Sequence, residues 1–220
     1  MSRWGSELWY QFNFCLTYLV YTFGWSFKSS GQHHVPPSGP VLILANHESF
    51  LDPVAIGLAV RRRINYLARK TLFTHPLFGE YLRSVGSVPV DQAGVAKEGL
   101  RASIDLLQAG KALLIFPEGE RAWDGVMQAF KPGIALVLRK APVTILPVGV
   151  AGAYQAYPRA AKLPRFAPLF WPPSGAGIAC SIGAPIPPER YANLEREELL
   201  DFLFQAVKGE VEKAEKLRLK

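Results

Sequence analysis

The chain contains only two cysteines, Cys15 and Cys180, among its 220 residues. Two widely separated cysteines provide neither the spacing of a zinc site nor the framework of a disulfide-stapled domain. We therefore expect no bound metal, and we interpret both thiols as buried apolar side chains in a reducing compartment. The sequence also lacks any Gly-x-Ser-x-Gly segment, which argues against the nucleophile elbow of a serine hydrolase.

No nucleic-acid-binding motif accompanies the basic character of the chain, whose formal net charge is +7 and whose pI is about 9.5. We therefore expect no nucleic-acid partner. The cations gather in two short segments: Arg61, Arg62, Arg63, Arg69 and Lys70, and then Arg159, Lys162 and Arg165. Two interpretations stay open for these clusters, attraction to anionic lipid headgroups and simple solvation.

Residues 8–27 contain no charged residue and are crowded with Trp, Tyr and Phe. A helix of that length reaches about 30 Å, the thickness of a hydrocarbon core. Polar residues interrupt the run, and its aromatic rings favour the headgroup boundary. We therefore favour a partly inserted, monotopic helix over a single span, and the weak basic n-region and missing cleavage site argue against a signal peptide. The predicted division is a hydrophobic membrane anchor over residues 1–30 and one domain over residues 31–220.

The rest of the chain alternates between short apolar runs and helical patterns, and its 18 prolines and 19 glycines indicate many loops. The runs predict strands at 41–45, 65–68, 85–90, 112–116, 143–150 and 177–182, and the helical patterns lie at 97–108, 136–139 and 195–216. This alternation is typical of an α/β fold with a mainly parallel central sheet and helices on both faces. Internal repeats, low-complexity tracts and dividing linkers are not evident.

Residues 46–53, Asn-His-Glu-Ser-Phe-Leu-Asp-Pro, follow directly after the first apolar run and place His47 five positions before Asp52. Polar residues at the carboxyl end of a strand lie where open α/β sheets bind ligands. The imidazole of His47 suits proton transfer at neutral pH, and Asp52 can fix its tautomer. Five helical residues turn by about 140° beyond a full circle, so the two side chains meet only through an irregular turn. Pro53 is expected to disfavour helical geometry at Asp52; the alternative is that both residues only cap a helix.

A second charged turn, Phe-Pro-Glu-Gly-Glu-Arg at 116–121, follows the run at 112–115. With this segment the sequence resembles the glycerolipid acyltransferase superfamily, typified by bacterial lysophosphatidic acid acyltransferases. Its first signature is Asn-His-x-Ser-x-x-Asp and its third is Phe-Pro-Glu-Gly-Thr-Arg-Ser. Segments 86–91, 130–133 and 145–148 agree with the other motifs in the family's order. The resemblance covers roughly residues 40 to 190.

This resemblance implies a membrane-associated O-acyltransferase domain at 31–220. His47 is implied as the general base that deprotonates an acceptor hydroxyl as it attacks an acyl thioester, and Asp52 as the residue that supports the imidazole. Such a base contributes about 10²- to 10⁴-fold to the rate. Backbone N–H groups near residues 117–119 are candidate donors to the oxyanion. The family implies no metal or organic cofactor; acyl-coenzyme A or an acyl carrier protein serves as the acyl donor, and the basic clusters also fit these donors.

The substrate-binding residues implied by the resemblance lie in and after the second charged turn. Arg121 and Lys131 are expected to seat the phosphate of a 1-acyl-glycerol-3-phosphate-like lysophospholipid; the alternative is a solvated surface pair. Glu118, with Gly119 beside it, is expected near the acceptor hydroxyls or in the scaffold of the turn. The partners are then membrane lipid, the acyl donor and the lysolipid, at the cytoplasmic face of the cell membrane, where thioesters are made.

Three residues depart from the family pattern. Glu120 stands where Thr is usual, Ala122 replaces Ser, and Gln92 follows the second motif where many members carry Arg. The departures remove one potential phosphate ligand and add a negative charge beside the headgroup site. An acceptor other than a phosphatidate precursor (an aminolipid, a sugar or a small alcohol) therefore stays open. So do hydrolysis of the thioester and a lipid-binding protein without catalysis.

Overall fold

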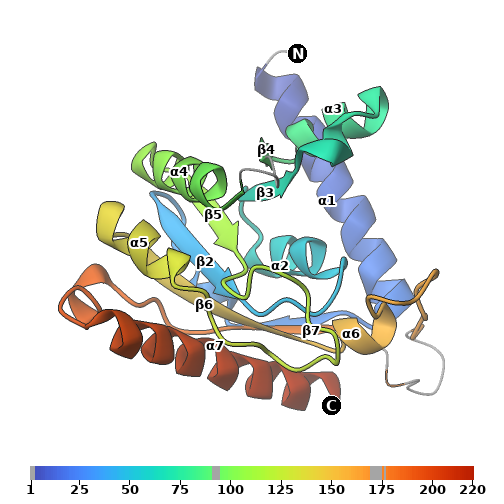
Figure 1. Cartoon of the computed structure of the whole chain (residues 1–220). Coiled ribbons are helices and arrows are strands. Elements are labelled where there is room, and N and C mark those ends of the chain that lie inside the picture. Colours follow the sequence, from blue (N-terminus) through green and yellow to red (C-terminus); the bar gives the residue numbers. More distant parts are fainter. Residues whose placement is uncertain (1–2, 91–94, 169–174, 176) are drawn as a thin grey trace.

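The computed structural model describes residues 3–90, 95–168, 175 and 177–220. One seven-stranded sheet organises them, with the strand order β1-β7-β6-β2-β5-β3-β4 (Figure 1). The strands are β1 (Lys28–Ser30), β2 (Val41–Ala45), β3 (Asn65–Arg69), β4 (Ser87–Val90), β5 (Ala112–Ile115), β6 (Thr144–Ala151) and β7 (Ala179–Ile182). The pairs are parallel except for β6 and β7, which run antiparallel. The predicted mainly parallel sheet is confirmed.

Helices connect the strands and cover both faces of the sheet. They are α1 (Arg3–Trp25), α2 (Asp52–Val60), α3 (Pro76–Ser84), α4 (Val95–Gln108), α5 (Gly133–Lys140), α6 (Ala153–Ala156) and α7 (Arg196–Arg218), with 3-10 turns at Gln32–His34, Lys70–Phe73 and Pro188–Arg190. Figure 1 shows α7 along one side of the sheet and α1 and α2 on the other.

Strand β2 lies at the centre because its side chains are apolar on both faces, and all five of its residues are buried. Val41 and Ile43 pack on the side of α1, α2 and α6. Leu42 and Leu44 pack on the side of α4, α5 and α7. Burying such an aliphatic side chain stabilises the fold by about 1.5–3 kcal/mol relative to exposure. A strand buried on both faces is typical of a parallel sheet.

The order of the strands brings the two charged turns together. Strand β5 pairs with β2 in parallel, with Leu44 opposite Ile115, although β3 and β4 lie between them in the sequence. Parallel neighbours end at the same edge of the sheet. The segment after β2 therefore meets the segment after β5.

Helix α1 packs against the domain through one face only. Tyr21 and Trp25 are buried, and the Tyr21 hydroxyl donates to the Leu51 carbonyl over 3.0 Å. The opposite face is an exposed apolar stripe made of Trp4, Leu8, Phe12, Leu16, Leu19, Val20 and Phe23. Among the described residues, no helix is both long enough and apolar enough to cross a membrane.

Several elements differ from what the sequence predicts. Strand β1 and helices α3 and α6 are additional; β1 consists of Lys-Ser-Ser and owes its strand geometry to pairing with β7. Cys180 is buried as expected, but Cys15 is exposed on α1, because the apolar face of that helix is only partly covered. Gln92 and residues 169–174 fall outside the described residues.

Candidate active site

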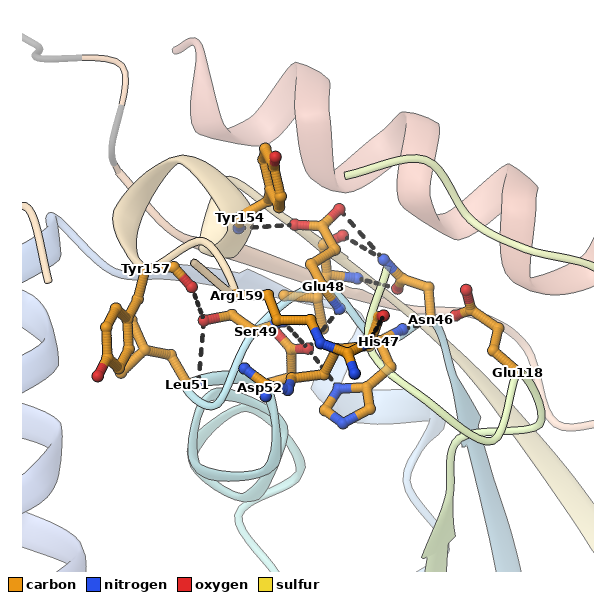
Figure 2. A network of polar contacts seen from close by, with 12 residues as sticks. Asn46, His47, Glu48, Ser49, Leu51, Asp52, Glu118, Tyr154, Tyr157 and Arg159 are labelled. Atoms are coloured by element: carbon orange, nitrogen blue, oxygen red, sulfur yellow. Dashed lines mark hydrogen bonds and ion pairs between the residues drawn. The ribbon is translucent and has the colours of Figure 1, made fainter. Parts of the chain in front are cut away.

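His47 and Asp52 meet at the carboxyl end of β2. His47 Nδ1 lies 2.8 Å from Asp52 Oδ2, and Asp52 is fully buried. The same oxygen accepts from the backbone N–H groups of Glu48 and Ser49, over 2.6 and 2.7 Å (Figure 2). A carboxylate held by two backbone donors fixes the imidazole, with the proton on Nδ1 and Nε2 left as the basic nitrogen. The predicted contact is present in the structure.

The turn that joins the two residues is irregular, as the spacing requires, but the expected effect of Pro53 was wrong. Asp52 is the first residue of α2, and Leu51 before it already has helical torsion angles, φ −78° and ψ −20°. Proline is tolerated in the first turn of a helix because its missing N–H has no partner there. The bend at residues 47–51 brings the pair together, and Asp52 does not leave the helix.

Phe116, at the end of β5, supports the imidazole from a second direction. The rings of His47 and Phe116 are 3.9 Å apart and only 11° from parallel. Stacking on Phe116 therefore fixes the plane of the His47 ring, and the contact with Asp52 fixes how the ring is turned within that plane. This role of Phe116 does not follow from its place in the sequence, since an aromatic residue at a strand end is usually assigned to the core.

Glu118 ties the two turns together. Its Oε1 accepts from the backbone N–H of His47 and its Oε2 from that of Gln128, both over 2.7 Å. In return, the Ala122 N–H donates to the His47 carbonyl over 2.8 Å. Burial raises the pKa of Glu118 to about 7. Of its two expected placements, these contacts favour the scaffold of the turn.

Arg121 reaches from the same turn over Phe50. Its guanidinium carbon lies 3.4 Å from the centre of the Phe50 ring. Its Nη1 is buried without a hydrogen-bond partner among the described residues. Burial, and after it the positive charge of Arg159, lowers the pKa of Arg121. A buried donor without a partner is costly. This placement suits an anionic ligand, and the Arg121 side chain is only partly exposed.

Lys131 lies across the turn at Gly119. Gly119 has φ +77°, and a β-carbon placed on it would come 2.8 Å from Lys131 Nζ. The Lys131 N–H donates to the Pro117 carbonyl over 2.8 Å, while its side chain is exposed. The backbone therefore favours glycine at position 119, and a β-carbon there would displace the exposed Lys131 side chain.

The hypothesis that residues 117–119 supply oxyanion donors narrows to one group. Pro117 has no N–H, and the Gly119 N–H donates to the Phe116 carbonyl over 3.1 Å. The Glu118 N–H is the remaining donor of the three.

Two residues of the first turn have structural tasks that the sequence did not indicate. The Asn46 amide donates to the Val150 carbonyl and accepts from the Val150 N–H, over 2.9 and 2.8 Å. Glu48 Oε2 accepts from the Tyr154 N–H over 3.2 Å. Burial, and after it the negative charge of Asp52, raises the pKa of Glu48 to about 8. Both residues attach the turn to β6 and α6. The described residues hold no group of three or more His, Cys, Asp or Glu side chains arranged for a metal ion.

Comparison with known proteins gives a family model, described as acyltransferase, that matches residues 26–151. A 1-acyl-sn-glycerol-3-phosphate acyltransferase from Streptococcus pneumoniae is 28% identical over 155 residues, 67% of this chain and 56% of that protein. A protein of the same name from Bacillus subtilis is 25% identical over 193 residues, 86% of this chain and 87% of that protein. The match thus spans about half of the first relative and most of the second.

The crystal structure of a 1-acyl-sn-glycerophosphate acyltransferase, PlsC, from Thermotoga maritima superposes with a TM-score of 0.70. It is 25% identical in sequence, and the superposition covers 86% of this chain and 72% of that one.

Proposed function

Because this chain belongs to the acyltransferase family, we propose that it transfers a fatty acyl group from an acyl thioester to the hydroxyl of a lysophospholipid similar to 1-acyl-glycerol-3-phosphate. The observation that carries this proposal is the contact of 2.8 Å between His47 Nδ1 and Asp52 Oδ2. It leaves Nε2 of a neutral imidazole as a base beside a turn that carries Arg121. The names of the relatives support the lysophospholipid class.

In the proposed reaction, His47 Nε2 takes the proton of the acceptor hydroxyl as that oxygen bonds to the thioester carbonyl carbon. The carbonyl becomes a tetrahedral oxyanion, and the Glu118 N–H is its proposed donor. Collapse of the intermediate breaks the carbon–sulfur bond. The proton on Nε2 then passes to the leaving sulfur, and Asp52 stabilises the imidazolium between these steps. No covalent acyl-enzyme forms.

Arg121 and Lys131 are the proposed cations for the acceptor phosphate. The buried Nη1 of Arg121, which none of the described residues pairs with, gains a hydrogen bond when a phosphate oxygen binds. Lys131 contributes a point charge above Gly119. Acyl-coenzyme A or an acyl carrier protein is the proposed acyl donor.

We further propose that residues 1–30 attach the domain at 31–220 to the cytoplasmic face of the cell membrane as a monotopic anchor. The support is the exposed stripe on α1, from Trp4 to Phe23. Helix α3 lies beside the N-terminal half of α1 (Figure 1), and Trp9 Nε1 donates a hydrogen bond of 3.2 Å to Ser84 Oγ between them. The exposed side chains of Leu77 and Phe78 on α3 extend the apolar surface of the stripe. Docking on the leaflet avoids a cost on the order of 10 kcal/mol for lifting a long acyl chain into water.

The test offers detergent-solubilised protein a long-chain acyl-coenzyme A with a panel of lysolipids, aminolipids, sugars and small alcohols. Thiol release and ester formation are measured together. We expect acceptor-dependent ester in equal amount to the thiol, and a rate at least about 10²-fold lower in His47→Ala. His33→Ala is the matched control, since His33 is exposed in the turn at Gln32–His34, and it should retain full activity.

Retained transfer in His47→Ala contradicts the assignment of the base. Thiol release that does not need an acceptor identifies a thioesterase. If acyl-coenzyme A gives no reaction, the assay is repeated with acyl carrier protein, and silence with both donors identifies a protein that binds lipid without turnover.

A further inference from the structure

Glu120, one of the departures from the family pattern, has a partner that the sequence did not reveal. Arg159, three residues beyond α6, donates from Nη1 to Glu120 Oε2 over 3.1 Å and to the Arg121 carbonyl over 3.2 Å. Its guanidinium carbon lies 3.6 Å from the centre of the Trp123 ring. The Arg159 side chain is 25% exposed and that of Glu120 55%. Arg159 is therefore fixed against the turn that carries Arg121.

A second side chain from the same region holds this arrangement. The Tyr154 hydroxyl donates to the Trp123 carbonyl over 2.9 Å, and a β-carbon on Gly125 would come 2.8 Å from the Tyr154 ring. The turn is thus clamped at two places by residues of α6 and the segment after it. Arg159 is thereby held at the turn that carries Arg121, while its partner Glu120 stays half exposed.

The two neighbouring guanidinium groups, those of Arg121 and Arg159, differ in whether a carboxylate balances their charge. Burial is the main cause that lowers the pKa of Arg121, and the nearby positive charge of Arg159 is the second. Glu120 forms an ion pair with Arg159, whereas Arg121 stacks on Phe50 and its buried Nη1 has no hydrogen-bond partner in the described part of the chain. Of the two guanidinium groups, that of Arg121 is therefore the one without a carboxylate in an ion pair among the described residues, although buried Asp52 also acts on its charge. With a neutral residue at position 120, Arg159 would also present its charge to a ligand.

We propose that the pair of Glu120 and Arg159 sets the headgroup charge that the acceptor site selects, favouring a lysophospholipid with a singly charged phosphodiester over one with a phosphomonoester. The inference rests on the proposed function and names its substrate class. A phosphomonoester carries a charge of about −1.5 to −2 at pH 7, and the half-exposed carboxylate of Glu120 repels that additional charge. The same carboxylate attracts the ammonium of a zwitterionic headgroup, such as phosphoethanolamine.

The test compares kcat/KM for two acceptors with the same acyl chain, 1-acyl-glycerol-3-phosphoethanolamine and 1-acyl-glycerol-3-phosphate, in the same micelles. We expect the native protein to prefer the phosphodiester at pH 7.5. Glu120→Gln keeps the shape and the hydrogen bond to Arg159 but removes the charge. It should shift the ratio toward the phosphomonoester about three- to tenfold, mainly through KM.

Arg159→Gln gives a second variant with the opposite sign. It leaves the Glu120 charge uncompensated and should shift the ratio further toward the phosphodiester. At pH 5.5, where the phosphomonoester approaches one negative charge, the effect of Glu120→Gln on the ratio should shrink; a purely structural role would not produce this change. Glu212→Gln, on the exposed side of α7, should leave the ratio unchanged.

A native preference for the phosphomonoester, or equal shifts of the ratio in Glu120→Gln and Arg159→Gln, overturns the inference while acyl transfer itself stands. Absence of transfer to either acceptor from both acyl-coenzyme A and acyl carrier protein instead contradicts the proposed function.

Discussion

At the scale of single residues, one oxygen atom organises the site. Asp52 Oδ2 accepts hydrogen bonds from His47 Nδ1 and from the backbone N–H groups of Glu48 and Ser49. The other oxygen, Oδ1, is buried without a hydrogen-bond partner among the described residues. One carboxylate oxygen therefore holds both the imidazole and the backbone of the turn, and changes at Asp52 should affect the two together.

Asp52→Asn tests this dependence. The amide keeps the volume of the carboxylate but has no negative charge to stabilise the imidazolium formed during proton transfer. We expect kcat to fall about 10²-fold or more, with little change in the acceptor KM. Steady-state kinetics measures both constants. Asp105→Asn, an exposed change on α4, is the control, and an unaltered kcat in Asp52→Asn would contradict the role of the pair.

Gly119→Ala should weaken acceptor binding and the fold together. The residue has φ +77°, and the new β-carbon would lie 2.8 Å from Lys131 Nζ. We expect a loss of about 1–3 kcal/mol in the free energy of unfolding and a higher acceptor KM as Lys131 is displaced. Denaturant unfolding and kinetics measure the two effects. Gly110→Ala shares the positive φ but has open space around it, so it should lose stability without the change in KM.

Glu48 predicts a pH dependence of stability. Burial, with Asp52 next, raises its pKa from 4.5 to about 8. Between these values the folded protein keeps a proton that the unfolded chain has lost, so the contribution of Glu48 to stability falls as the pH rises. We expect Glu48→Gln to reduce the fall in unfolding free energy from pH 6 to pH 8 by about 1 kcal/mol per pH unit. Denaturant unfolding at both pH values tests this, and an unchanged slope would show that Glu48 is ionised in the fold.

At the scale of the elements, the contact between β6 and α7 leaves no room for a side chain at Gly149. A β-carbon on Gly149 would lie 2.1 Å from the Glu210 carbonyl carbon and from the Val211 nitrogen, both of them backbone atoms. These atoms belong to the middle of α7 and have no rotamer that relieves the clash. The close approach of helix and strand thus depends on one missing side chain.

Gly149→Ala should therefore separate α7 from the sheet and cost about 3 kcal/mol or more. Gly209→Ala, in the same helix but with open space around it, should instead stabilise the protein by about 0.5–1 kcal/mol through helix propensity. Thermal or denaturant unfolding of both variants gives the two signs. Equal effects would mean that α7 adjusts its position freely.

At the scale of the whole molecule, apolar surface gathers on one side. The stripe on α1 and the exposed Leu77 and Phe78 of α3 belong to neighbouring helices. Exposed cations flank α1 on its other face, with Arg61 over the Tyr18 ring and Arg63, which also pairs with Glu7, over the Tyr10 ring. An apolar stripe flanked by cations suits the surface of a bilayer, whose interior is apolar and whose headgroups are anionic.

The double variant Phe12→Ser and Leu16→Ser should lower binding to vesicles of anionic phospholipid about ten- to hundredfold. Each change removes an exposed apolar side chain whose insertion contributes on the order of 1 kcal/mol. Cosedimentation with vesicles measures the affinity. Gln11→Ala, an exposed change in the same helix, is the control, and an undiminished affinity in the double variant would remove α1 from the membrane contact.

The sequence alone determined the class of fold and pointed to His47 and Asp52 as the candidate pair, whose contact the structure contains. Apolar runs such as that of β2 mark strands because burial on both faces demands continuous hydrophobicity. His47 and Asp52 were found because polar residues directly after such a strand lie at an edge where ligands bind. The ordered motifs also predicted the family that the comparison with known proteins confirms.

Only the tertiary structure decided which distant residues serve that pair. The place of β5 beside β2 puts Phe116 under the imidazole and Glu118 behind its backbone. Arg159 looked like one cation of a basic cluster, yet it forms an ion pair with Glu120, which lies 39 residues away in the sequence. Periodicity and local propensity carry information about neighbours along the chain. Such contacts depend on the order of strands in the sheet, which local patterns do not encode.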